Sequence, residues 1–116
     1  MSIFRNSYGV GEPIDWHPAA AAKAREILKE RGQLEELKVA VHDVEFWKGM
    51  HFGFGLGFRN LLRNNGFRET EVGVSNLDDH YMAIVALTAG YEIEGYYDVF
   101  YMGAEDIHAN LKKCAS

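Results

Sequence analysis

The glycine-rich stretch GMHFGFGLGFRNLLRNNG, residues 49–66, decides how the chain folds. Its glycines alternate with large apolar residues, so the run fits a strand, a helix or a ligand-binding loop. A dinucleotide-binding loop requires the spacing G-x-G-x-x-G, but Phe58 stands where the last glycine would be. A P-loop requires Gly-Lys followed by Ser or Thr, which this stretch lacks. These two mismatches argue against a nucleotide-binding loop.

A helix fits the stretch better than a strand does. In a strand, three glycines would leave one face with no side chains to pack. At about 100° per residue, a helix instead gathers the small residues into one narrow stripe. The stripe comprises Gly49, Gly53, Gly57, Asn60 and Asn64. Each glycine costs a helix roughly 1 kcal/mol, so another backbone must pack closely against the stripe to offset that cost. The pattern predicts a central glycine-rich helix.

The segment SNLDDHYMAIVALTAG, residues 75–90, predicts the helix that packs against it. A second stripe of small residues runs along this segment. It comprises Asp79, Ala83, Ala86 and Gly90. The connection between the two predicted helices allows them to run antiparallel with the stripes face to face. This pairing would bring Asp78 close to Arg59 or Arg63.

Two earlier segments also predict helices. Residues 15–32, DWHPAAAAKAREILKERG, begin with Asp15 as a good N-cap and carry Pro18 in the first turn, where a missing N–H matters least. Residues 33–49 have apolar side chains at helical spacing, although positions 37–41 also alternate like a strand. We favour a helix there, because no turn signal interrupts the segment.

The remaining segments are less regular. Residues 67–74 are expected to form a connection, and residues 91–103 fit either a helix or a bent strand. Residues 104–116 predict a short closing helix, with Lys112 and Lys113 at its end where they favour the helix dipole.

We therefore expect a mainly α fold, a compact bundle of four to five helices around the glycine-rich helix. Residues 15–116 form its single helical domain, and residues 1–14 form an extended N-terminal arm. The alternative is an α+β fold with a small sheet. Its strands would be LKVAV, EVGV and YEIEGYYDVFY.

Composition limits the classes of function. Twelve Lys and Arg against 17 Asp and Glu give a net charge of −5, which argues against nucleic acid as a partner, because phosphate binding needs a basic face. Cys114 is the single cysteine, which rules out an internal disulfide and fits a reducing, cytoplasmic setting. A membrane partner is not expected either, because a membrane-spanning helix needs about 18 consecutive apolar residues. We expect no cofactor.

HFGFGLGFRNLLRNNGF, followed by SNLDDHYMAIV, resembles an uncharacterised family of small, mostly bacterial proteins. The family pattern is His-Phe-Gly-x-Gly, then Arg-Asn, then an Asp-Asp pair that opens a later helix. The matching residues are His51, Phe52, Gly53, Gly55, Arg59, Asn60, Asp78 and Asp79, within about residues 47–86. Where the family carries a tryptophan-bearing segment after Arg-Asn, this chain has Leu61, Leu62 and Arg63. The resemblance implies no activity and only indicates which polar residues matter.

These polar residues form a candidate pocket. Arg59 and Asn60, with Asp78 or Asp79, fit a buried structural ion pair, which is the interpretation we favour. The same group fits the floor of a pocket for an acidic or amide-bearing ligand, with His51 as a proton carrier.

A metal site is not expected. Glu105 and His108 have the E-x-x-H spacing of di-iron helical bundles, but such sites need a second pair and two further glutamates. Asp78, Asp79 and His80 stand together at a helix start, where acidic side chains stabilise the helix dipole without any metal.

The sequence favours a small, soluble, non-enzymatic interaction or regulatory protein, such as an oligomeric accessory subunit, that binds a protein partner or itself. Aromatic residues with an acidic rim are typical of interfaces. The candidate contact residues are Ile3, Phe4, Tyr8, Tyr91, Tyr96, Tyr97, Phe100 and Tyr101. The tyrosines fit core-capping roles equally well. The rival hypothesis is a small enzyme or ligand-binding domain with its pocket around His51, Arg59, Asn60 and Asp78 or Asp79.

Overall fold

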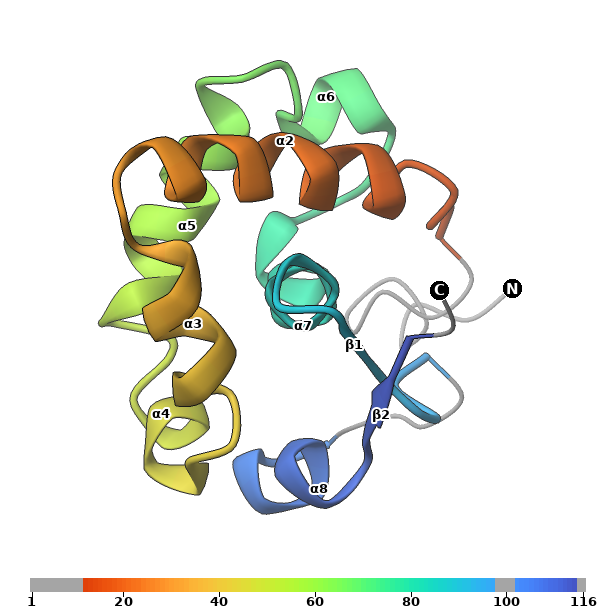
Figure 1. Ribbon diagram of the computed structural model, residues 1–116. Helices are drawn as coiled ribbons and strands as arrows, with labels where there is room; N and C mark the ends of the chain where they lie inside the picture. Colours follow the sequence, from red (N-terminus) through yellow and green to blue (C-terminus); the bar gives the residue numbers. More distant parts are fainter. Residues whose placement is uncertain (1–11, 98–101, 115–116) are drawn as a thin grey trace.

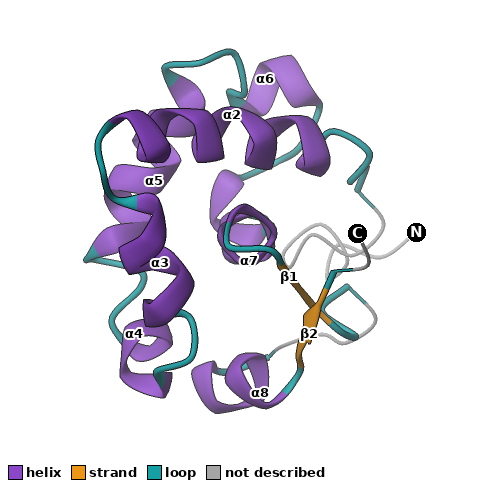
Figure 2. Ribbon diagram, viewed as in Figure 1, coloured by secondary structure: helices purple, strands orange, loops and turns teal. Residues whose placement is uncertain are grey.

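Helix α7, Tyr81–Thr88, lies at the centre of the computed structural model, which describes residues 12–97 and 102–114 (Figure 1). The other helices are α2 (His17–Glu30), α3 (Leu34–Ala40), α4 (Val44–Lys48), α5 (Phe54–Arg63), α6 (Glu69–Val72) and α8 (Ala104–Ala109). A 3-10 turn, η1 (Leu77–Asp79), precedes α7, and strands β1 (Tyr91–Ile93) and β2 (Leu111–Lys113) pair antiparallel. The mainly helical fold is confirmed, with a small two-stranded sheet added (Figure 2).

The buried character of α7 follows from its sequence, YMAIVALT, which is apolar on every side. Such a helix is stable only where other elements enclose it. Helix α2 crosses it, α5 and η1 pack beside it, and β1 continues from its end. Ile84 and Val85 are fully buried. The expectation that the glycine-rich helix is central was therefore wrong, because α5 keeps an exposed face.

The glycines of the opening stretch do not form the predicted stripe. Helix α5 begins at Phe54, so Gly49 and Gly53 precede it in a turn. Gly57 is exposed, and a Cβ there would meet nothing within 4 Å. Gly55 makes the close approach instead. A Cβ at Gly55 would collide with the Met50 carbonyl oxygen and the Tyr81 ring. Helices α5 and α7 do pack together, but through a glycine outside the stripe.

Residues 33–49 are helical, as favoured, but in two pieces, α3 and α4. The break falls at Asp43, whose side chain accepts a hydrogen bond from the Glu45 N–H (2.9 Å) and so caps the second helix. The proposed strand at 37–41 is therefore absent, and EVGV lies partly in α6. Within the described residues of the alternative strands, which exclude 98–101, only Tyr91–Ile93 forms a strand.

The chain end differs from the expected closing helix. Helix α8 stops at Ala109, and Lys112 and Lys113 lie in β2, where they pair with Glu92 and Tyr91 of β1. Backbone pairing with β1 therefore prevailed over a longer helix. The predicted arm is described only from Glu12 onward, and Ile3, Phe4, Tyr8, Phe100 and Tyr101 lie outside the described residues.

Helix ends were predicted only in part. Pro18 lies in the first turn of α2, as expected, but Trp16 occupies the cap position and makes no side-chain cap, so Asp15 does not serve as the N-cap. Among residues 12–97 and 102–114, no helix combines the length and apolarity that crossing a membrane would require.

Replacing Gly55 by Ala should lower the free energy of unfolding by about 3 kcal/mol, because the new methyl group has no room beside a backbone oxygen and a buried ring. The control is Gly57→Ala, which adds the same methyl group where the chain itself has open space and should leave the free energy of unfolding of the isolated chain unchanged or raise it by up to about 1 kcal/mol. Urea unfolding of the two variants measures the difference. Equal effects at the two positions would contradict the close approach at Gly55.

Candidate functional site

The polar side chains gather where η1 passes into α7. Asp78, Asp79 and His80 follow one another there, at a 3-10 turn with about three residues per turn. Successive side chains consequently point in different directions. Asp78 contacts Arg59, Asp79 lies near Glu12, and His80 enters the interior.

Arg59 is a buried clamp between two parts of the chain. Its Nε lies 3.1 Å from Oδ1 of Asp78, and the Arg59 side chain is 6% exposed. Its terminal nitrogens contact His51, donating to the carbonyl oxygen at 3.1 Å and lying 3.3 Å from Nδ1. The guanidinium also lies over the Tyr81 ring, 4.7 Å from the centroid. Each of the three guanidinium nitrogens thus has a polar partner within the chain, which fits a structural role.

The structure thus brings together three of the five candidate pocket residues: His51, Arg59 and Asp78. Asn60 is exposed, and its side chain accepts a hydrogen bond from Arg63. Asp79 does not join Arg59. Burial, and next the negative charges of Glu12 and Asp78, raise the pKa of Asp79 to about 6.

A buried chain of hydrogen bonds, which the sequence did not reveal, lies on the other side of η1. An oxygen of Glu12 lies 2.8 Å from Nε2 of His80, and Nδ1 of His80 lies 3.0 Å from Nε2 of His17. Glu12 also accepts from the N–H and hydroxyl of Ser75, at 2.9 and 2.7 Å. The Glu12 carboxylate can only accept, so the proton of His80 is assigned to Nε2. Nδ1 of His80 is then an acceptor, which assigns the proton of His17 to its Nε2. Nδ1 of His17 then remains an acceptor.

The two histidines of this hydrogen-bonded chain, His17 and His80, are neutral near pH 7. Burial, and next the charge of His80, lowers the pKa of His17 to about 3. Burial also lowers the pKa of His80, although Glu12 opposes this effect. For Glu12 itself, burial raises the pKa, but hydrogen bonds from His80 and Ser75 outweigh it and the net pKa is lowered.

One end of the histidine chain borders a cavity of about 320 Å³. His17 and Tyr97 line it, together with apolar side chains that include Ile14 and Leu87. The Tyr97 hydroxyl is 3.4 Å from a nitrogen of each histidine. This wall offers hydrogen bonds to a small, partly apolar ligand. The histidines do not activate Ser75 as a nucleophile, because the Ser75 hydroxyl donates to Glu12 and not to an imidazole.

The aromatic contact surface is only partly as expected. Tyr91, Tyr96 and Tyr97 are half-buried, and the Tyr91 hydroxyl is 3.0 Å from Nε2 of His42. The large apolar side chains that are exposed among the described residues lie elsewhere. They are Phe52 at 87%, Val39 at 74%, Leu56 at 46%, Ile14 at 44% and Phe54 at 36%. Three of these five come from the turn before α5 and its first residues.

The E-x-x-H pair makes separate contacts. Nε2 of His108 lies 2.8 Å from the His42 carbonyl oxygen, and Glu105 is 4.0 Å from the Lys48 amine. In the part of the chain that the structure describes, no three His, Cys, Asp or Glu side chains are placed to hold a metal ion together.

Removing Asp78 should destabilise the fold more than removing Arg59. Asp78→Ala leaves a buried guanidinium without its carboxylate and should lower the free energy of unfolding by about 3 kcal/mol. Arg59→Met keeps an apolar chain in the same place and leaves Asp78, which is 37% exposed, to water, so its cost should be smaller. Urea unfolding of both variants measures the order. The reverse order would show that Arg59 is not the buried member of the pair.

Replacing His17 by Gln should change how stability depends on pH. The folded-state pKa of about 3 lies below the ordinary value of 6.5, so only the unfolded chain binds the proton as pH falls between these values. The parent should therefore lose about 2 kcal/mol of unfolding free energy relative to the variant between pH 7 and pH 5. Urea unfolding at both pH values tests this. A constant difference would contradict a neutral, buried His17.

The chain matches no protein-family model, no curated protein and no solved structure at a significant level. The resemblance of residues 47–86 to a bacterial family stays a prediction. Function is accordingly inferred from the geometry of the chain itself.

Proposed function

We propose that the protein is a small, non-enzymatic interaction protein that acts as a homodimer, in the manner of an accessory or regulatory subunit. The observation that carries this proposal is the exposed apolar segment Phe52–Leu56. Phe52 is 87% exposed, and Phe54 and Leu56, which follow it in the same short segment, are 36% and 46% exposed. Single exposed apolar side chains are ordinary, whereas several on one short segment mark an interaction site.

The segment is held firmly in place. The Phe54 ring packs on Phe46 and on Phe58, with centroids 5.5 and 5.6 Å apart, and Phe58 belongs to the core. Arg59 fixes the preceding turn through the His51 carbonyl oxygen. An apolar surface that is already ordered loses little conformational freedom on binding, which favours association.

A second copy of the chain is the occupant that fits this surface. Beside the exposed side chains lies a groove of about 230 Å³ between the end of α2 and the start of α5. Its lining includes Leu28, Gly53, Gly57 and Leu61. One face of the chain thus carries both the protruding side chains, Phe52 and Leu56, and an apolar groove that can receive such side chains from a second copy. A two-fold dimer requires such self-complementarity.

Gly57 supports a close approach from outside. Glycine within a helix costs roughly 1 kcal/mol relative to alanine, yet no described atom lies close enough to exclude a side chain there. A second α5 crossing at this position would use the space, since helices without intervening side chains pack at the short end of the 8–10 Å range.

A second candidate function, binding of a small ligand, is favoured by the cavity beside His17 and Tyr97. In that case the hydrogen-bonded histidine chain is the recognition element, and dimer formation is not required.

The dimer is tested by measuring mass in solution by sedimentation equilibrium over a range of concentrations. We expect twice the chain mass of 13.1 kDa for the parent, and dissociation for the double variant Phe52→Ser with Leu56→Ser. Loss of two buried apolar side chains should weaken association at least about a hundredfold.

Val39→Ser is the matched control, because Val39 is 74% exposed on α3 and does not line the groove. It should leave the mass unchanged. Unaltered circular dichroism would show that the double variant still folds. A monomeric parent, or a dimer that survives the double substitution, would overturn the proposal and leave the ligand-binding candidate.

A further inference from the structure

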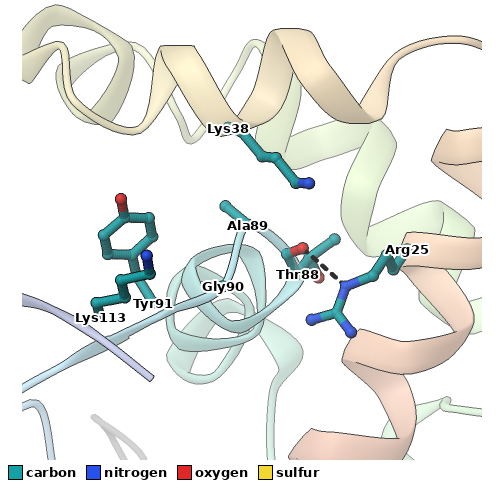
Figure 3. Close-up of a pocket in the computed structure, with 7 residues that line it drawn as sticks. All are labelled: Arg25, Lys38, Thr88, Ala89, Gly90, Tyr91 and Lys113. Atoms are coloured by element: carbon teal, nitrogen blue, oxygen red, sulfur yellow. Dashed lines mark hydrogen bonds between the residues drawn. The ribbon is translucent and has the colours of Figure 1, made fainter. Parts of the chain in front are cut away.

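A third concave surface, at the opposite end of α7 from η1, has a different character. It is a cavity of about 500 Å³ lined by side chains of α2, α3, β1 and β2 and by the end of α7 (Figure 3). Its lining residues are Arg25, Lys38, Thr88, Ala89, Gly90, Tyr91 and Lys113. Three of the seven are cationic and none is acidic, although the chain as a whole carries −5.

Arg25 is positioned by the fold. Its Nε donates to the Thr88 carbonyl oxygen at 3.2 Å and one terminal nitrogen donates to that of Leu87 at 2.8 Å. These carbonyl groups lie at the C-terminal end of α7, where the helix dipole is negative. The positive charge of the guanidinium offsets this partial negative charge. Arg25 also lines the cavity, and a guanidinium already fixed in place binds an anion with little further loss of freedom.

Lys113 reaches the cavity because of the strand register. It pairs with Tyr91, so the two side chains lie on one face of the sheet, whereas Lys112 pairs with Glu92 and lies on the other. The Cys114 N–H donates to the Gly90 carbonyl oxygen at 3.0 Å and anchors this end of β2 beside α7. Lys112 approaches Glu94 at 3.9 Å, but Lys113 makes no ion pair within the described residues.

Lys38 projects from α3 toward the end of α7 (Figure 3). It contacts Glu35 at 3.2 Å, but the Glu35 side chain is 84% exposed. An exposed pair of this kind is worth at most about 1 kcal/mol, so an anion can replace Glu35 as the partner of Lys38. A neighbouring hollow of about 450 Å³ shares Arg25 and Lys38 and adds Lys29, with Glu35 as its one acidic lining residue.

We propose that this cavity binds a small anion carrying at least two phosphate groups, held between Arg25, Lys38 and Lys113. Three cations from separate elements converge on a space of the size that small-ligand sites have. Arg and Lys around a cavity of one sign are the groups that recognise phosphate oxygens. Tyr91 on the same wall offers a ring against which an attached base or sugar packs.

The test is titration of the full chain with inorganic pyrophosphate and with ADP by isothermal titration calorimetry. We expect both to bind, more weakly as salt is raised, because the attraction is between charges at an open surface. Lys113→Gln should weaken pyrophosphate binding about tenfold, and Lys38→Gln by a similar factor. Tighter binding of ADP than of pyrophosphate would assign a contact to the attached nucleoside, and equal binding would restrict the site to phosphate.

Lys112→Gln is the matched control. It removes the same charge from the neighbouring position of the same strand, on the face away from the cavity, and should leave the affinity within about twofold. Amide NMR signals of Gly90 and Tyr91 should shift on titration, which would locate the anion. Absence of pyrophosphate binding, or equal losses for Lys112→Gln and Lys113→Gln, would overturn the proposal.

Discussion

The enclosure of α7 is the constraint on which the rest of the structure depends. Its eight residues are too few to hold a helix in water alone, because isolated helices shorter than about 12–15 residues are marginal. Packing on all sides supplies the stability that length does not. Ile84 and Val85 have no exposure, and Tyr81 fills the space that Gly55 leaves open. The positions of α2, α5 and β1 follow from the need to cover this one helix.

Side chains from distant segments lie at both ends of α7, although no side chain caps the first turn of the helix. At the start, Asp78 and His80 contact Arg59 and Glu12. At the end, Arg25 takes up the last carbonyl groups. Polar side chains therefore collect at these two ends, and both ligand-sized cavities discussed above border them, one at His17 and one at Arg25. Each cavity consequently shares residues with the framework that holds the helix.

Local periodicity predicted what depends on neighbours in sequence. Helices at 15–32, 33–49 and 75–90 and the approach of Asp78 to Arg59 all follow from spacing. The histidine chain does not, because Glu12 and His17 lie 68 and 63 positions from His80 and no local pattern connects them. Strand β1 appeared only within the alternative strand YEIEGYYDVFY, and β2 was expected to be helix, since each strand has three residues and pairs across a long separation. The apolar sequence of α7 was a better sign of the central helix than the glycine stripe.

The glycines also show why spacing alone misled. The predicted stripe left out Gly55, where a Cβ would collide with the Met50 carbonyl oxygen and the Tyr81 ring, and included Gly57, where a Cβ would meet nothing within 4 Å. The cationic hollows and the apolar groove likewise use different residues of α2 and its C-cap. Arg25 and Lys29, four residues apart, border the cationic hollows, whereas Leu28 and Arg31, three apart, border the apolar groove. No residue that lines a cationic hollow also lines the apolar groove. A dimer formed at the groove therefore leaves the cationic cavity open, and one chain can carry both interactions at once.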